Sequence, residues 1–171
     1  MGVRSSMERR DPRMQRLFIE PDLAPGSPVQ ADRGQSNYIM NVLRLREGDG
    51  ILLFNGRDGE WLCHVEPQGR KSCALIPVRQ IRTQPAPSDL LYCFAPLKQA
   101  RLDYMIQKAV ELGVGVLQPV ITRHTQVASP NVDRMRANAI EAAEQCGILS
   151  IPRLAQPVRL DRLVENWSAE R

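Results

Sequence analysis

The sequence predicts a mixed α/β chain in which a small β-rich barrel precedes an alternating α/β domain. Three observations predict this division: short strand patterns with turn signals fill residues 14–84, a proline-stiffened linker occupies residues 85–88, and strand and helix patterns alternate over residues 89–171. Residues 1–13 are polar and charged, and we expect them to form a disordered basic tail. A length of 171 residues accommodates two small domains.

The composition is that of a soluble globular protein, with 43% hydrophobic and 25% charged residues. No run of 18 apolar residues occurs, so we expect no membrane span, and the arginine-rich N-terminus lacks the apolar segment of a secretory signal. The four cysteines, at positions 63, 73, 93 and 146, form no CxxC pair. Isolated cysteines of this kind are typical of buried thiols in a reducing compartment rather than of a zinc site. We therefore expect a cytoplasmic protein without a metal.

The formal net charge of +4 is concentrated near the N-terminus, where five arginines precede position 17 against two acidic residues. This balance permits nucleic-acid binding without requiring it. Arginine outnumbers lysine twenty to three, which suits bidentate phosphate contacts. A GC-rich coding sequence produces the same bias, so composition leaves both explanations open.

The elements of the barrel follow from local patterns. Asn55-Gly56 is a strong hairpin turn signal, and Pro77 implies an edge position or a bulge in the last strand. Prolines and glycine at 21–28 mark a loop. The predicted elements are strands at 15–19, 51–54, 60–66 and 71–82 and one helix at 36–45.

In the second part, strands and helices alternate, which implies a parallel sheet with right-handed crossovers. Gly113 and Gly147 are placed to end two helices, and Ser129-Pro130 is placed to open the second. The predicted elements are strands at 90–94 and 114–120, an extended piece at 153–158, and helices at 101–112, 129–146 and 161–167.

Each of the first two helices of this part carries an apolar and a polar stripe. The expected core positions are Leu102, Ile106, Ala109 and Val110 in one helix, and Val132, Met135, Ala139, Ala142, Ala143 and Cys146 in the other. The polar stripes include Arg101, Tyr104, Lys108 and Glu111, then Glu141 and Glu144. A solvated surface explains them most simply.

A polar loop, Thr122-Arg123-His124-Thr125, follows the second strand of the α/β part. In open α/β sheets ligands bind at the carboxyl ends of strands. His124 is a candidate proton carrier or RNA contact there, and an ordinary loop histidine is the simpler alternative. No phosphate loop, GxGxxG motif or serine nucleophile elbow occurs.

Several motifs follow one another along the chain: Arg16-Leu17-Phe18-Ile19, Tyr38-Ile39-Met40-Asn41-Val42-Leu43-Arg44-Leu45 followed by Gly48-Asp49, Phe54-Asn55-Gly56, Ile106-Gln107-Lys108, Glu111-Leu112-Gly113-Val114, and Ala142-Ala143-Glu144-Gln145-Cys146-Gly147 followed by Pro152. In this order and at these separations they resemble the motifs of the bacterial 16S rRNA (uracil-N3) methyltransferases, members of the SPOUT (α/β-knot) superfamily. The resemblance runs from about residue 14 to residue 167. His124 and Ile148 stand where many members have arginine.

The resemblance implies a PUA-like RNA-binding β-barrel over residues 14–84 and the first part of a SPOUT methyltransferase domain over residues 89–171. It also implies S-adenosylmethionine as cofactor, a homodimer, and methylation of N3 of a specific uridine in 16S rRNA of the small ribosomal subunit. A non-catalytic RNA-binding or ribosome-assembly protein that keeps the same scaffold is the alternative.

Candidate residues follow from the implied reaction. Arginine stabilises negative charge that develops on uracil oxygens, which makes Arg101 and Arg123 catalytic candidates. The candidates for RNA binding are Arg16, Arg44, Arg46 and His124. The family's glycine-rich cofactor loop and its later LRTET-like segment do not occur in this sequence, so we expect the cofactor-binding residues mainly beyond Arg171.

We expect a chain that ends at Arg171 to bind S-adenosylmethionine poorly and to associate, because a parallel sheet without its last strands leaves apolar surface uncovered. Isothermal titration calorimetry measures the cofactor affinity, with a full-length relative as positive control. Micromolar binding by the 171-residue chain would contradict the expectation.

Overall fold

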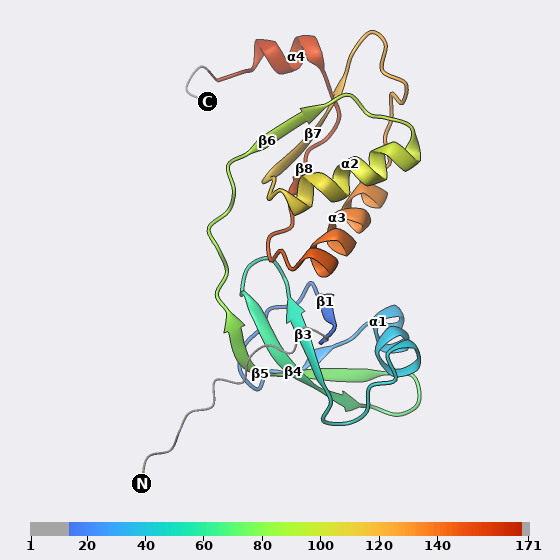
Figure 1. Ribbon diagram of the computed structural model, residues 1–171, viewed down its shortest axis with the longest axis vertical. Helices are drawn as coiled ribbons and strands as arrows, with labels where there is room; N and C mark the ends of the chain where they lie inside the picture. Colours follow the sequence, from blue (N-terminus) through green and yellow to red (C-terminus); the bar gives the residue numbers. More distant parts are fainter. Residues whose placement is uncertain (1–13, 169–171) are drawn as a thin grey trace. The chain divides into compact units, whose positions relative to one another are not determined.

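The computed structural model describes residues 14–168, and the chain divides between Gln84 and Pro85 into two compact units (Figure 1). We call residues up to Gln84 unit 1 and residues from Pro85 unit 2. The tail predicted at residues 1–13 lies outside the described residues. Over the described range, no helix has the length and apolar character needed to cross a membrane.

Unit 1 is built on a five-stranded sheet that curls into a half-barrel. Its strands, in spatial order, are β1 (Arg16–Phe18), β3 (Gly50–Phe54), β4 (Glu60–Pro67), β5 (Cys73–Arg82) and β2 (Val29–Gln30). β1 pairs parallel to β3, and the other pairs are antiparallel. The four predicted strands are confirmed, whereas the two-residue β2 is too short to show a period and was not predicted.

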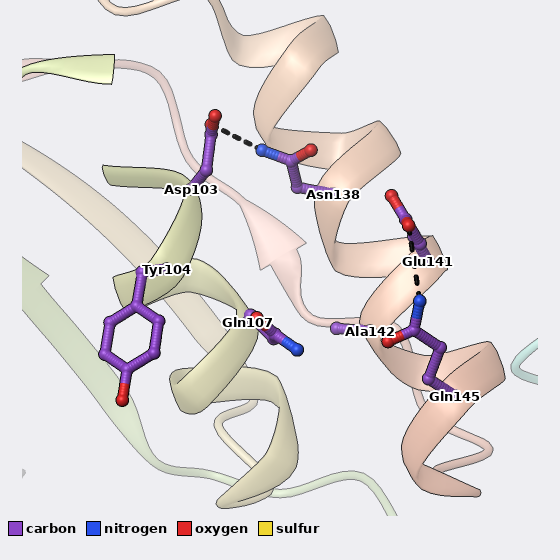
Figure 2. Close-up of a pocket in the computed structure, with 7 residues that line it drawn as sticks. All are labelled: Asp103, Tyr104, Gln107, Asn138, Glu141, Ala142 and Gln145. Carbon is purple, nitrogen blue, oxygen red and sulfur yellow. Dashed lines mark hydrogen bonds between the residues drawn. The ribbon is translucent and has the colours of Figure 1, made fainter. Parts of the chain in front are cut away.

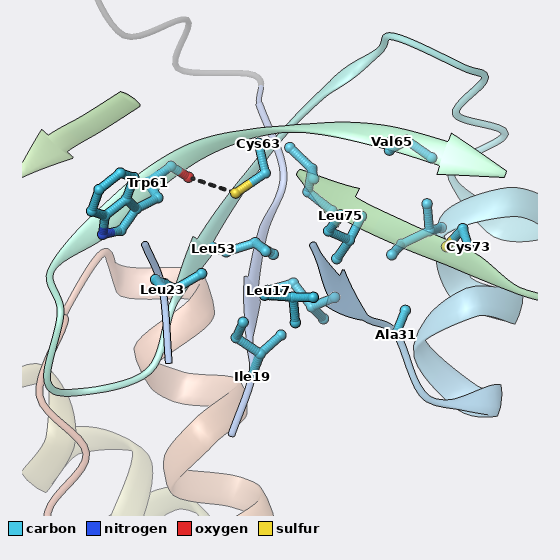
Figure 3. Close-up of a cluster of buried hydrophobic side chains, with 13 residues drawn as sticks. Leu17, Ile19, Leu23, Ala31, Leu53, Trp61, Cys63, Val65, Cys73 and Leu75 are labelled. Atoms are coloured by element: carbon cyan, nitrogen blue, oxygen red, sulfur yellow. Dashed lines mark hydrogen bonds between the residues drawn. The ribbon is translucent and has the colours of Figure 1, made fainter. Parts of the chain in front are cut away.

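The core of unit 1 forms because strand side chains alternate between two faces of the sheet. On β4, Trp61, Cys63 and Val65 are buried while His64 and Glu66 are exposed, as the alternation predicts. Figure 3 shows these inward side chains meeting those of the neighbouring strands. The cluster consists of Leu17, Ile19, Leu23, Val29, Ala31, Ile39, Ile51, Leu53, Trp61, Cys63, Val65, Cys73 and Leu75.

The bulge predicted at Pro77 is present. The β4–β5 register passes from Leu62 opposite Arg79 to Cys63 opposite Pro77, so Val78 is the extra residue. β2 pairs only with Ala74 and Leu75 of β5, so among the described strands Pro77 has a partner on the β4 side alone. Bulges bend and twist a strand, which helps this sheet to curl.

The helical segment of unit 1 consists of a short α-helix, α1 (Arg33–Asn37), followed by a π-helical turn, η1 (Tyr38–Val42). It begins and ends three residues before the predicted helix. The start is a capping box: the Asp32 carboxylate accepts from the Gln35 backbone N–H at 2.8 Å, and the Gln35 side chain accepts from the Asp32 N–H at 3.0 Å.

Unit 2 has the predicted alternation and a parallel sheet. Its elements are β6 (Leu91–Phe94), α2 (Gln99–Glu111), β7 (Val116–Ile121), α3 (Val132–Cys146), β8 (Arg153–Leu154), β9 (Val158–Arg159) and α4 (Leu160–Glu165). The strand order is β6-β7-β8, with β9 also paired to β7, and every pair is parallel. Helices α2 and α3 pack side by side (Figure 1). Among the described strands, β6 pairs with β7 alone.

Helices α2 and α3 end at glycines, as predicted. Gly113 and Gly147 have φ angles of 77° and 79°, the left-handed conformation that ends helices. The predicted Ser129 cap is wrong: Asn131 caps α3 and accepts from the Arg134 N–H at 2.9 Å. Pro130 therefore precedes the cap rather than opening the first turn.

The expected core positions of α2 are confirmed, and those of α3 are confirmed except at its two ends. Val132 is half-buried and Cys146 is exposed. Among the other cysteines, Cys63 and Cys73 are buried and Cys93 is half-buried. Burial raises the pKa of the Cys63 thiol to about 12.

A buried ion pair joins three strands of unit 1. Glu60, at the start of β4, is fully buried and accepts from Arg16 Nε of β1. Arg82, at the end of β5, lies 3.4 Å from the other carboxylate oxygen. The Arg16 guanidinium lies 4.5 Å from the centre of the Phe54 ring, a cation–π distance.

Replacing Glu60 with Ala should destabilise unit 1 by about 3–5 kcal/mol, because it removes the carboxylate that balances the buried Arg16 charge. Urea unfolding followed by Trp61 fluorescence in a Trp167→Phe background measures the change. Glu66→Ala, at an exposed position of the same strand, is the matched control and should change stability by less than about 0.5 kcal/mol. Equal effects of both substitutions would contradict a structural role for the pair.

Candidate functional site

Two of the predicted site segments leave the same edge of the unit 2 sheet. Strands β6 and β7 are parallel, and Phe94 pairs with Pro119, so both strands end at the same level. The chain after β6 leads into α2, whose first turn carries Arg101. The chain after β7 carries Arg123 and His124. The topology thus assigns these three side chains to the carboxyl edge of one parallel sheet, where ligands bind in folds of this type.

The loop after β7 is shaped by two threonines. The Thr122 backbone N–H donates to Thr125 Oγ1 at 2.7 Å, the Thr125 N–H donates to the Thr122 carbonyl at 3.3 Å, and the two hydroxyl oxygens lie 3.0 Å apart. Arg123 and His124 lie at the tip of this closed turn and are exposed. The threonines therefore fix the backbone that presents both side chains to solvent.

 Arg101 is exposed and lines a hollow of ≈ 730 Å³ between β6 and α2. Its lining is mainly apolar and includes Leu90, Leu91, Tyr92, Leu97, Met105, Leu112 and Val114. Lys108 also lines it, lies 5.5 Å from the centre of the Tyr104 ring, and bonds Glu111 at 2.8 Å. Arg101 and Lys108 thus bring two cations to an apolar hollow.

A separate polar cleft of ≈ 310 Å³ lies between α2 and α3 (Figure 2). Asp103 lines this cleft, and its carboxylate accepts from Arg134 Nη2 at 2.8 Å, from Gln99 Nε2 at 2.9 Å and from the Asn138 amide. These hydrogen bonds, the one from Arg134 foremost, lower the pKa of Asp103. Sequence reasoning missed this cluster, because no linear signal pairs residues on two different helices.

The predicted RNA-binding residues of unit 1 have two kinds of environment. Arg44 and Arg46 are exposed, and the Arg46 backbone N–H donates to Asp49 Oδ2 at 2.7 Å. Arg16 is only 8% exposed, and its guanidinium is held by Glu60. Arg16 therefore has an ion-pair partner within unit 1, and its contact with RNA stays a prediction. Across residues 14–168, no group of three or more His, Cys, Asp or Glu side chains is arranged to hold a metal ion.

Comparison with known families decides the relationship of the chain. A family model described as an RNA methyltransferase domain matches residues 84–171, and one described as an RNA methyltransferase PUA domain matches residues 31–78. The first match covers half of the chain. The chain belongs to the RNA methyltransferase domain family. The methyltransferase match contains Arg101, Arg123 and His124, and the PUA match contains Arg44 and Arg46.

Relatives of this chain in the RNA methyltransferase family are longer than the chain itself. The chain is 33% identical over 153 residues to the ribosomal RNA small subunit methyltransferase E of Rickettsia conorii, and the match covers 88% of this chain and 63% of the relative. It is 28% identical over 154 residues to the protein of the same name from a Synechocystis strain, covering 88% of this chain and 50% of the relative. The chain therefore spans between half and two thirds of the length of these relatives.

Solved structures of similar fold include two with a bound cofactor. A methyltransferase from Legionella pneumophila in complex with SAM is 27% identical, with a TM-score of 0.79 over 91% of this chain and 67% of that one. The ribosomal RNA small subunit methyltransferase E from Neisseria gonorrhoeae, bound to S-adenosyl methionine, is 24% identical, with a TM-score of 0.82 over 92% and 67%. The second likeness concerns the fold alone.

Asp103→Asn should destabilise unit 2 by about 1 kcal/mol, because it removes the charge that joins α2 to α3. The pKa of Asp103 is lowered in the folded state, so its contribution is present above the unfolded pKa of about 3.9 and is lost as pH falls through the lower folded value. Urea unfolding at pH 7 and at pH 3 measures this difference.

The matched control is Glu165→Gln in the exposed Arg162–Glu165 pair of α4, which should change stability by less than about 0.5 kcal/mol. A destabilisation by Asp103→Asn that is the same size at both pH values would contradict the ionic role.

Proposed function

We propose that this chain carries the RNA-binding part and the first half of the catalytic domain of an S-adenosylmethionine-dependent ribosomal RNA methyltransferase. The observation that carries the proposal is the succession of two RNA methyltransferase models, PUA over residues 31–78 and methyltransferase over residues 84–171. The relatives named ribosomal RNA small subunit methyltransferase E support 16S rRNA as substrate. The finer assignments, N3 of a specific uridine, a cytoplasmic homodimer and a SPOUT fold, rest on the family resemblance.

The proposed reaction places specific demands on the uridine. A methyl carbon leaves the sulfonium of S-adenosylmethionine as its C–S bond breaks, an N3–C bond forms, and the N3 proton passes to a base. The uracil ring must be held out of its stack in the RNA. Negative charge develops on the uracil oxygens as the proton leaves, so donors fixed near those oxygens accelerate the reaction.

The cations at the carboxyl edge of the unit 2 sheet suit this task. Arg101 and Arg123 each offer a planar set of N–H donors, which pair with carbonyl oxygens and carry a fixed positive charge. We assign charge stabilisation to these two arginines. His124, at the tip of the same turn as Arg123, and Arg44 and Arg46 of unit 1 are assigned contacts to the RNA.

The described residues do not form a site that fits S-adenosylmethionine. The hollow between β6 and α2 is bordered by Arg101 and Lys108, whose charges repel a sulfonium. The cleft between α2 and α3 contains Asp103 and Glu141, but mainly polar side chains line it and it offers no apolar slot for an adenine. We therefore assign no cofactor-binding residues within the described part of the chain.

A second candidate, supported by the PUA match over residues 31–78, is a non-catalytic RNA-binding or ribosome-assembly protein. The two candidates differ in one observable. The enzyme leaves a methyl group at N3 that blocks Watson–Crick pairing, whereas the binding protein leaves the uridine unchanged.

The test adds the natural full-length protein and S-adenosylmethionine to small subunits that lack the modification, followed by primer extension. We expect a stop at one uridine. Arg101→Ala and Arg123→Ala should each lower kcat about 100-fold, because each removes a donor to the developing charge. Arg162→Ala, in the exposed pair of α4, is the control and should leave kcat unchanged.

Unchanged turnover of the Arg101→Ala protein would remove Arg101 from the catalytic residues. Subunit binding without any primer-extension stop would overturn the enzymatic proposal in favour of the binding protein.

A further inference from the structure

Two unusual backbone features meet at the end of the helical segment of unit 1. In the π-helical turn η1, the Leu43 N–H donates to the Tyr38 carbonyl at 2.9 Å, and the Leu45 N–H donates to the Ile39 carbonyl at 3.0 Å. The next residue after this turn and its cap, Arg44, has a φ of 57°, the one positive φ of a non-glycine residue in the described range. π-Helical turns and strained residues recur at functional sites.

Arg44 takes a conformation in which helices usually place glycine. A side chain in this conformation costs about 1–2 kcal/mol. The Arg44 side chain is exposed, so it does not fill the core of the half-barrel. Glycine would relieve the strain without removing a buried contact. We infer that the exposed Arg44 guanidinium contacts a partner outside unit 1.

The solvent face of α1 and η1 presents an aromatic ring beside hydrogen-bonding amides. Tyr38 is 36% exposed and Val42, four residues later, is 61% exposed. Asn41 Nδ2 donates to Asn37 Oδ1 at 2.8 Å, and this bond leaves Asn37 Nδ2 and Asn41 Oδ1 available as a donor and an acceptor. The opposite side of the segment carries Ile39 into the core. Ile39 therefore packs the segment against the core, whereas Tyr38 and Val42 present apolar surface to solvent.

Arginine and acidic side chains are equal in number around this face, three of each over residues 32–49. Arg33, Arg44 and Arg46 are all exposed. Two nearby carboxylates accept backbone N–H groups of the segment, Asp32 from Gln35 and Asp49 from Arg46. Glu47 is the remaining acidic side chain of the stretch from 33 to 49.

We propose that this face, made of Arg33, Asn37, Tyr38, Asn41, Val42 and Arg44 and called here the α1–η1 face, binds an unpaired segment of RNA. Tyr38 stacks on a base, the Asn37–Asn41 pair bonds a base edge, and the arginines contact the flanking phosphates. A duplex offers phosphates but hides base faces and edges, so the combination of ring, amides and cations selects single strands. This inference rests on the RNA-binding part of the proposed function and not on methyl transfer.

The experiment measures fluorescence anisotropy of the 171-residue chain with a labelled single-stranded oligoribonucleotide and with a hairpin of the same composition. Tyr38→Ala should weaken single-strand binding about tenfold and leave hairpin binding unchanged, whereas Tyr38→Phe should retain it. Arg44→Gly should weaken binding, lower the salt dependence by about one phosphate contact, and raise Tm because it relieves the strained backbone. Arg70→Ala, at an exposed position between β4 and β5, is the matched control and should change Kd less than twofold.

Unchanged single-strand affinity in both Tyr38→Ala and Arg44→Gly overturns the proposal that the α1–η1 face binds RNA. A preference of the chain for the hairpin also overturns it. So do variants that bind RNA normally but are defective in binding a ribosomal protein. A lowered Tm in Arg44→Gly contradicts the argument from strain. Single-strand binding through this face in a full-length protein that leaves no primer-extension stop supports the face and overturns the enzymatic proposal. A primer-extension stop with normal kcat and KM in the full-length Tyr38→Ala protein supports the enzymatic proposal and overturns the α1–η1 face.

Discussion

The buried carboxylate of Glu60 is the interaction on which unit 1 depends. Removing a carboxylate from water costs several kcal/mol unless charged donors replace the water. Those donors come from Arg16 on β1 and Arg82 on β5, so strands on opposite sides of β4 must each bring a side chain to Glu60. A shift of register in β1 or β5 would leave the charge unsatisfied, which fixes the curled sheet and, through the core, the position of Ile39 and the helical segment around it.

In unit 2 the corresponding constraint is parallel strand pairing. Because β6 and β7 run in the same direction, their carboxyl ends meet at one edge, and β9 extends that edge beside Ile121. The helices return behind the sheet, where Asp103 joins α2 to α3. The geometry thus separates two kinds of polar chemistry: exposed cations at the strand ends, and a carboxylate satisfied by helix side chains between α2 and α3.

What could be predicted from sequence is what depends on near neighbours. The period of β4 and the apolar stripe of α2 require only residues a few positions apart, and the glycines at 113 and 147 require only the end of their own helix. What could not be predicted depends on partners far along the chain. Arg16 and Glu60 are 44 positions apart and Asp103 and Asn138 are 35 apart, so neither the burial of Arg16 nor the polar cleft had a local signal.

Local chemistry also misled where two signals competed. Ser129 and Asn131 are both good caps, and the proline between them favoured the first, yet the helix starts at the second. At the other helix, Asp32 and Gln35 have the spacing of a capping box, but the apolar periodicity begins only at Tyr38 and favoured a later start. An error of two or three residues in a helix start changes which side chains are expected to face solvent.

The four thiols differ in burial, so a thiol-reactive dye can label the natural sequence selectively. Cys63 and Cys73 are sealed in the half-barrel, and the pKa of about 12 keeps the Cys63 thiol protonated at neutral pH. Cys146 is exposed at the last turn of α3, and Cys93 is only half-buried on β6. A maleimide dye applied briefly to the folded protein therefore attaches first at Cys146, which places a fluorophore in unit 2 without any substitution.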